Sequence, residues 1–309
     1  MTTDQISYLV FGIVLIIAII FDLGLLSKKS SVISMKRALW QTAIWVGLAL
    51  LFMGFIWFEK GQNIAIEYLS AYLMEWSLSM DNIFVFILIF SVLKIPEKHV
   101  PRALLIGILM AIIFRIVFIS VGIVLIEKFV WLLYVFGTFL VYTGVKIFAV
   151  KHEEEFNLSK NSVYNFLIKV LKLAPDDESG KFIIVKNGER LFTNIFVVII
   201  LLATTDIVFA LDSIPAVFAI SRDKLVIFTS NIFAVLGLRS LFFLLKGAVH
   251  KFAYLQQGIA IVLIFIGAKM LAEYFHVKVP VFISLIIIGI CLAGSIAYSV
   301  QESKKQKKI

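Results

Sequence analysis

Long apolar stretches recur along this chain of 309 residues and restrict it to a membrane-spanning fold. Each stretch has about 18 residues or more, enough for an α-helix to cross the hydrocarbon core of a bilayer. Hydrophobic residues make up 61% of the chain and charged residues 16%, against about half and a quarter in globular proteins. We therefore expect an all-α polytopic membrane protein with nine transmembrane helices, at residues 6–26, 38–58, 68–93, 102–126, 129–150, 192–221, 225–245, 252–275 and 279–300.

The basic residues predict the orientation of these helices. If the N-terminus lies outside, most of the 29 Lys and Arg residues fall on the cytoplasmic side, as the positive-inside rule requires. We therefore expect a multi-pass protein of the cell inner membrane, N-out and C-in, whose first stretch is retained rather than cleaved as a signal peptide. The net charge of +9 is then explained by cytoplasmic basic residues that anchor the protein at anionic lipid, and we expect no nucleic-acid partner.

Four carboxylates interrupt the apolar stretches, and they come in two pairs with the same spacing. Glu75 is followed by Asp81, and Asp206 is followed by Asp212. An acid placed in hydrocarbon costs about 2.5–3.5 kcal/mol on insertion scales. Two equally spaced pairs of such acids indicate that the chain uses them on something that crosses the membrane.

The acid pairs belong to a longer internal repeat. Each pair is followed, one span later, by an arginine and then by a Gly-x-Lys; these residues are Arg115 and Lys146 in the first unit and Arg239 and Lys269 in the second. Each unit has three spans, and because three is odd, the second unit enters the membrane from the opposite face. Inverted repeats of this kind place the substrate site of a transporter near the midplane. The alternative is an old duplication that is kept only for packing.

The repeat organises the predicted domains. We expect two N-terminal transmembrane helices, a first three-helix repeat, a cytoplasmic loop, a second three-helix repeat, and a final helix with a basic tail. Within the loop, an amphipathic helix is predicted at 161–173, and Asn187-Gly188 predicts the turn of a hairpin. The five segments are 1–67, 68–150, 151–191, 192–278 and 279–309.

The spacing within each acid pair limits how its two carboxylates act together. Residues six apart on a regular helix differ by about 120° around the axis and about 9 Å along it. Either the helix is interrupted between the two acids, or the acids serve different depths of one pathway. Pro215 after Asp212 favours an interruption, as do the polar side chains Ser77, Ser79 and Asn82 in the first motif.

Inversion of the second unit predicts the depth of each acid. Asp81 and Asp212 would meet near the midplane, with Glu75 and Asp206 as outer and inner stations. Asp22, near the inner end of the first span, is a fifth candidate, with solvation at the cytoplasmic surface as the alternative.

The residue types near the acids indicate the class of ion. The four histidines lie in loops or at span ends, and the single cysteine, Cys291, is distant in sequence, so a zinc or copper site is not expected. Carboxylates supported by Asn82, Ser213 and Thr205 form an oxygen-only set that suits Mn²⁺, Ca²⁺ or Mg²⁺.

Four basic residues are candidates for balancing the acids when no metal is bound. Arg115 and Arg239 lie mid-span, and the repeat order suggests Glu75 and Asp206 as their respective partners. Lys146 and Lys269 lie nearer the span ends, where reaching the membrane surface is an equally good explanation.

These motifs resemble a known family. FDLGLL, EWSLSMDNIFVF, TTDIVFALDSIPAVFAI and the LGLRSLFFLL segment with Arg239 are similar to the TerC membrane proteins, bacterial proteins named for tellurium resistance and linked to manganese export. The resemblance covers nearly the whole chain. It implies membership of the LysE-like exporter group, a role in metal-ion efflux, and Asp22, Glu75, Asp81, Asp206 and Asp212 as the acidic motif positions.

Together these observations predict a transporter that exports Mn²⁺, or Ca²⁺ in its place, through a carboxylate-lined midplane site coupled to protons. We expect no enzymatic activity and no cofactor, and the sequence has no Gly-x-x-x-x-Gly-Lys-Ser/Thr loop for ATP. Two alternatives are a non-transporting scaffold of a tellurite-resistance or secretion-linked complex, and a membrane redox enzyme acting on tellurium oxyanions.

Overall fold

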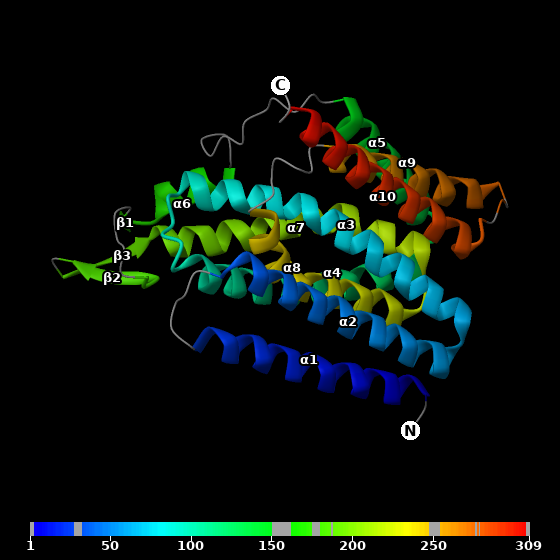
Figure 1. The fold of residues 1–309 in the computed structure, drawn as a ribbon, viewed down its shortest axis with the longest axis horizontal. Helices are drawn as coiled ribbons and strands as arrows, with labels where there is room; N and C mark the ends of the chain where they lie inside the picture. Colours follow the sequence, from blue (N-terminus) through cyan, green and yellow to red (C-terminus); the bar gives the residue numbers. More distant parts are fainter. Residues whose placement is uncertain are drawn as a thin grey trace.

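Long helices make up most of the structure, a computed structural model that describes residues 3–27, 33–149, 162–174, 180–186, 188–246, 254–275, 277 and 279–306 (Figure 1). Within these ranges nine helices have 18 residues or more, and they overlie the nine predicted stretches. They are α1 (Thr3–Ser27), α2 (Met35–Lys60), α3 (Gln62–Val92), α4 (Val100–Lys128), α5 (Leu132–Ala149), α7 (Asn194–Ile220), α8 (Lys224–Lys246), α9 (Leu255–Tyr274) and α10 (Val281–Gln306).

Membrane-spanning character is strongest in six of these helices. Judged on the described residues, α2, α4, α7, α8, α9 and α10 are long and apolar enough to cross a bilayer. Apolar residues occur on all sides of these helices, as expected for helices that face lipid or other helices and not water. The chain therefore folds as an all-α, multi-pass integral membrane protein.

Local sequence signals explain where individual helices begin and end. Gly61 separates α2 from α3 with φ +89°, a left-handed conformation that suits glycine, and its N–H donates to the Trp57 carbonyl oxygen at 3.1 Å. The Ser34 hydroxyl caps α2 by accepting from the Arg37 N–H at 3.4 Å. Pro101 opens α4, where its missing N–H costs no helical hydrogen bond.

The two helices that carry the acid pairs are continuous, which corrects the predicted interruption. α3 runs unbroken past Glu75 and Asp81, and α7 continues through Pro215. Proline removes a single intrahelical donor, and neighbouring helices hold a transmembrane helix together around such a gap. The two positions of each pair therefore differ by about 120° around the axis of a continuous helix and by about 9 Å along it.

Each helix of the first predicted unit packs against a helix of the second unit. α3 packs against α8, α4 packs against α7, and α5 packs against α9. α8 is the most enclosed helix, being covered by α2, α3 and α4, and its side chains from Leu225 to Phe242 are almost all buried. α1 lies along the edge of the bundle beside α2 (Figure 1).

Two glycines allow α5 and α9 to approach closely, and their contacts mirror each other. A Cβ added to Gly144 would lie 2.7 Å from the Ala260 carbonyl oxygen and 3.0 Å from the Ile264 nitrogen. A Cβ added to Gly267 would lie 2.5 Å from the Gly137 carbonyl oxygen and 2.8 Å from the Val141 nitrogen. Both glycines begin a Gly-x-Lys motif, so the repeated motif has a packing role: it allows two antiparallel backbones to touch.

Replacing Gly144 or Gly267 by Ala is expected to lower the stability of the folded protein. The added methyl group would meet rigid backbone of the facing helix, and overpacking of this kind typically costs about 1–3 kcal/mol. Thermal unfolding of the detergent-solubilised protein measures the loss. Gly47→Ala on α2 is the control, because a methyl group added there would have no heavy atom within 4 Å; equal melting temperatures for all three variants would contradict the close approach.

The segment between the two units forms a small subdomain at one end of the bundle (Figure 1). α6 (Ser162–Val170) buries Leu167 and packs on α7, within the range predicted for an amphipathic helix. β2 (Ile183–Lys186) and β3 (Glu189–Thr193) form the antiparallel hairpin, with Gly188 at φ +80°. The sequence pattern missed β1 (Leu173–Ala174), which pairs in parallel with β3 and is too short to show a period.

Candidate functional site

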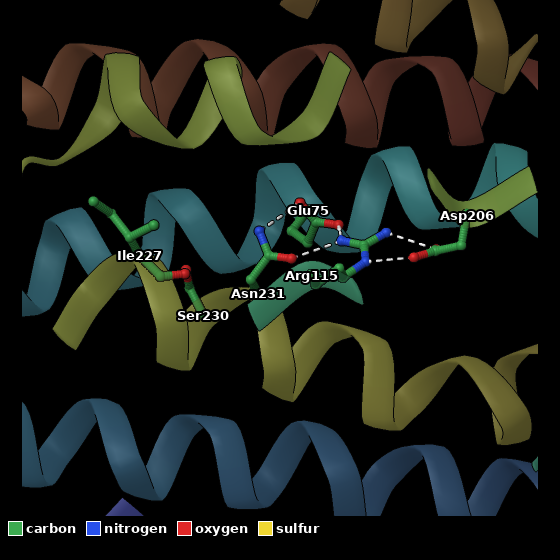
Figure 2. Close-up of polar contacts among 6 residues, drawn as sticks. All are labelled: Glu75, Arg115, Asp206, Ile227, Ser230 and Asn231. Carbon is green, nitrogen blue, oxygen red and sulfur yellow. Dashed lines mark hydrogen bonds and ion pairs between the residues drawn. The ribbon is translucent and has the colours of Figure 1, made fainter. Parts of the chain in front are cut away.

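A fully buried arginine joins two of the predicted acids. Arg115 on α4 donates to both carboxylate oxygens of Asp206 on α7, from Nε to Oδ2 at 2.9 Å and from Nη2 to Oδ1 at 2.8 Å. Its Nη1 donates to Glu75 Oε1 on α3. Figure 2 shows the guanidinium lying between the two carboxylates. Two helices of each predicted unit surround this site, since α8 supplies a fourth residue.

That fourth residue is Asn231, which the sequence analysis did not identify. Its Oδ1 accepts from Arg115 Nη1 at 2.6 Å, and its Nδ2 donates to Glu75 Oε2 at 3.1 Å (Figure 2). The amide thus closes a ring of hydrogen bonds around Glu75 and Arg115. The available signal was an amide in the middle of an apolar span, which is costly unless it is bonded.

The cluster carries unequal charge. One guanidinium faces two carboxylates, so the group of Glu75, Arg115 and Asp206 has a net charge of −1 when all three are ionised. Each of the three side chains has at most 1% of its surface exposed. Attraction between buried charges is strong because little water screens it, and the bidentate fork with Asp206 adds geometric specificity.

The shared guanidinium corrects one expectation and agrees with another. Glu75 and Asp206 are expected as outer and inner stations, and Arg115 lies between them along the direction of the helices and binds both (Figure 2). Asp206 was expected to partner Arg239, but both of its oxygens are bound by Arg115. The partner differs because a contact between helices depends on how they pack against one another, which the order of the repeats along the sequence does not give.

Arg239, the repeat counterpart of Arg115, lies on the enclosed helix α8 and is 2% exposed. Lys146 and Lys269, which occupy equivalent places in the two Gly-x-Lys motifs, differ in environment. Lys146 is exposed in the last turn of α5. Lys269 is buried and donates to the Ser284 hydroxyl on α10 at 3.2 Å. Reaching toward the membrane surface therefore explains Lys146 but not Lys269.

Several polar groups of the two acidic motifs are buried. Asn82 and Ser213 are both nearly inaccessible, whereas Thr205 is half-buried. In the first motif, the Ser77 and Ser79 hydroxyls have no hydrogen-bond partner within the described part of the chain. A hydroxyl that is buried without a partner is costly, and it keeps the capacity to donate or accept a hydrogen bond.

Three of the predicted acids have side chains outside the described part of the chain. The backbones of Asp22, Asp81 and Asp212 belong to α1, α3 and α7. Among the side chains that are described, no three acids, histidines or cysteines converge as a metal site would require. The described groups do form an oxygen-rich cluster in which Arg115 occupies the carboxylates.

The oxygens around Arg115 are of a type that also suits a metal ion. Glu75 and Asp206 supply four carboxylate oxygens, and Asn231 supplies an amide oxygen, which are ligands that hard divalent cations prefer. All of these oxygens now face the guanidinium or its partners (Figure 2). A cation at these oxygens would have to displace the Arg115 guanidinium.

Comparison with known proteins places the chain among bacterial membrane proteins. The sequence model of the integral membrane protein TerC family matches residues 60–307. An uncharacterized membrane protein of Myxococcus xanthus is 43% identical over 283 residues, which cover 92% of this chain and 88% of that protein. A counterpart in Rickettsia felis is 40% identical over 298 residues, covering 96% and 98% of the two chains.

A further relative carries a functional name. The Escherichia coli K12 protein, named as a proposed membrane-bound redox modulator, Alx, is 38% identical over 286 residues, which cover 89% of each chain. No solved structure matches this chain.

Proposed function

This chain belongs to the TerC family of integral membrane proteins, and we propose that it is a transporter that exports divalent cations, Mn²⁺ foremost, across the cell inner membrane. The observation that carries the proposal is the buried cluster of Glu75, Asp206 and Arg115. Two carboxylates in the interior of a membrane protein are expensive, and a chain that only needed packing would use apolar residues there. The excess negative charge favours a cationic substrate.

The mechanism we propose is alternating access between two inverted repeats, α3–α5 and α7–α9. α3 packs on α8, α4 on α7 and α5 on α9, and the contacts of Gly144 mirror those of Gly267. Both observations support a two-fold relation between these units. Glu75 and Asp206 lie at the interface of the units, one from each. A relative movement of the units would open the cluster to one side of the membrane and then to the other.

Arg115 acts in this scheme as an internal substitute for the substrate. In the metal-free state its guanidinium neutralises part of the carboxylate charge, so the empty transporter is stable in the bilayer. When Mn²⁺ binds, the arginine swings away, and Asp81 and Asp212 complete the oxygen set. Protons are the proposed counter-ion, because an acid of the site that is protonated in the metal-free state releases its proton when a metal binds.

Two further expectations remain part of the proposal. Nine transmembrane spans with the N-terminus outside would put the α6 and hairpin subdomain in the cytoplasm, where the basic residues of 162–190 suit anionic lipid. We propose no enzymatic activity and no resident cofactor.

The name of the Escherichia coli relative makes a redox role the second candidate. The chain has a single cysteine, Cys291, so it cannot form an internal dithiol, and none of its four histidines lies mid-span. An absorption spectrum of the purified protein separates the candidates, because bound haem or flavin absorbs visible light.

Metal uptake into inverted vesicles tests the proposed function directly. We expect Mn²⁺ to accumulate when a proton gradient is imposed, with Ca²⁺, Mg²⁺ and Zn²⁺ compared under the same conditions. Glu97→Gln is a suitable control, because this exposed acid pairs with Lys246 at the end of the bundle, remote from the cluster. Uptake by the wild type that is no faster than in empty vesicles would overturn the proposal and favour a scaffold.

A further inference from the structure

A second group of charges lines a cavity of about 590 Å³ at the opposite end of the bundle from the sheet. The start of α3, the α7–α8 connection and the end of α9 surround it, and this end is the outer one in the predicted orientation. Its charged lining residues are Glu67, Arg222, Asp223, Lys269 and Glu273.

Most of these charges are bound to one another or to neighbours. Asp223 binds Lys60 at 2.7 Å, and Glu273 lies 3.8 Å from Arg222 at the exposed rim. Glu67 and Lys269 differ, because each is held by a hydroxyl instead of a counter-charge. The Ser221 hydroxyl donates to Glu67 Oε2 at 2.5 Å, and the Lys269 ammonium donates to the Ser284 hydroxyl at 3.2 Å.

A lysine is uncommon at a buried position that lines a cavity. Lys269 is only 6% exposed, and one hydrogen bond uses one of the three donors of its ammonium. Both Glu67 and Glu273 attract it electrostatically across the cavity. Among the described residues the Lys269 ammonium forms no ion pair with Glu273 or Glu67, so it leaves the Glu67 carboxylate open to another cation.

The repeat shows that this pair is specific to one end of the protein. Glu67 precedes Glu75 by eight residues, and the residue that precedes Asp206 by eight is Val198, which is fully buried. Lys269 is buried at the cavity, whereas its counterpart Lys146 is exposed. The two ends of the protein therefore differ in charge although the two units are repeats.

Glu67 also lies between the buried cluster and the outer end of α3. It stands on the same helix as Glu75, about two turns or 12 Å closer to the outer end. A cation that leaves the cluster toward the cavity therefore meets Glu67 as its next described carboxylate on α3.

We propose that Glu67 is a second, exit-side site for divalent cations, and that the Lys269 ammonium expels the cation from it. The inference rests on the proposed function. Lys269 does at Glu67 what Arg115 does at the cluster: it offers the carboxylate a resident positive charge once the cation departs. This replacement also prevents external cations from re-entering, because the acid is then occupied.

Inhibition by metal on the outer side tests this pair. Inverted vesicles containing the full-length protein are preloaded with graded Mn²⁺, and the initial rate of Mn²⁺ uptake gives an inhibition constant for the lumenal ion. Glu67→Gln should weaken this inhibition, and Lys269→Gln should strengthen it, each by about fivefold or more, as expected for coupled sites. Lys269→Arg, which keeps the charge, should resemble the wild type.

The controls are Glu127→Gln and Lys224→Gln, an exposed ion pair at the same end of the bundle, 2.8 Å apart and outside the cavity. These variants should show wild-type inhibition. Suppose that the wild type takes up Mn²⁺, but Glu67→Gln and Lys269→Gln shift the inhibition constant for lumenal Mn²⁺ in the same direction or not at all. The proposed exit site is then wrong, while the proposed function stands. If the wild type itself takes up no Mn²⁺, the proposed function has failed.

Discussion

Replacing Arg115 by Gln is expected to destabilise the protein by about 3–5 kcal/mol, the usual cost of removing one partner from a buried ion pair. The loss leaves Glu75 and Asp206 facing each other without a positive charge, deep among four helices. Chemical or thermal unfolding in detergent measures the free energy of unfolding, and fluorescence-detected size exclusion reports the yield of folded protein.

A second substitution separates charge imbalance from simple loss of packing. Asp206→Asn in the Arg115→Gln background removes one of the two uncompensated carboxylates, so it should recover a large part of the lost stability. Arg115→Lys should not, because a lysine ammonium cannot form the two-pronged contact with Asp206. Additive effects of the two changes in a double-mutant cycle would show that the charges do not interact.

Asp206→Asn alone is expected to abolish Mn²⁺ transport while the protein still folds. The change keeps the side-chain size and leaves Arg115 paired with Glu75, so the cluster becomes neutral instead of negative. A neutral cluster in low dielectric no longer compensates the charge of a divalent cation. We expect the uptake rate in inverted vesicles to fall by about a hundredfold, the upper range for losing a group that supports a metal site.

Glu75→Gln should act like Asp206→Asn, since the two acids share one guanidinium. Asp81→Asn and Asp212→Asn are also expected to lose transport, because these positions complete the proposed oxygen set. Normal size-exclusion profiles establish that each variant is folded. Wild-type uptake in both Asp206→Asn and Glu75→Gln would show that the cluster is structural and that the substrate passes elsewhere.

Helix placement was predictable from the sequence, because it depends on local properties. A bilayer-spanning helix needs a continuous apolar stretch, and each of the nine stretches coincides with a long helix. The hairpin turn was equally local, since Gly188 adopts a positive φ that few other residues accept. The acids inside apolar sequence were conspicuous for the same reason, because a carboxylate in an apolar stretch stands out whichever helix supplies its partner.

Partners were decided by the tertiary structure, because they depend on how helices rotate and slide against one another. Spacing within α7 does not reveal that Asp206 faces Arg115 of α4, or that Asn231 of α8 joins them. Nor does the repeated Gly-x-Lys reveal that Lys269 is buried at a cavity while Lys146 is exposed. The sequence by itself determined which segments enter the membrane and which carry charge, since those are properties of single helices; the packing of α3, α4, α7 and α8 decided which charges meet, since a contact between helices is a property of their relative placement alone.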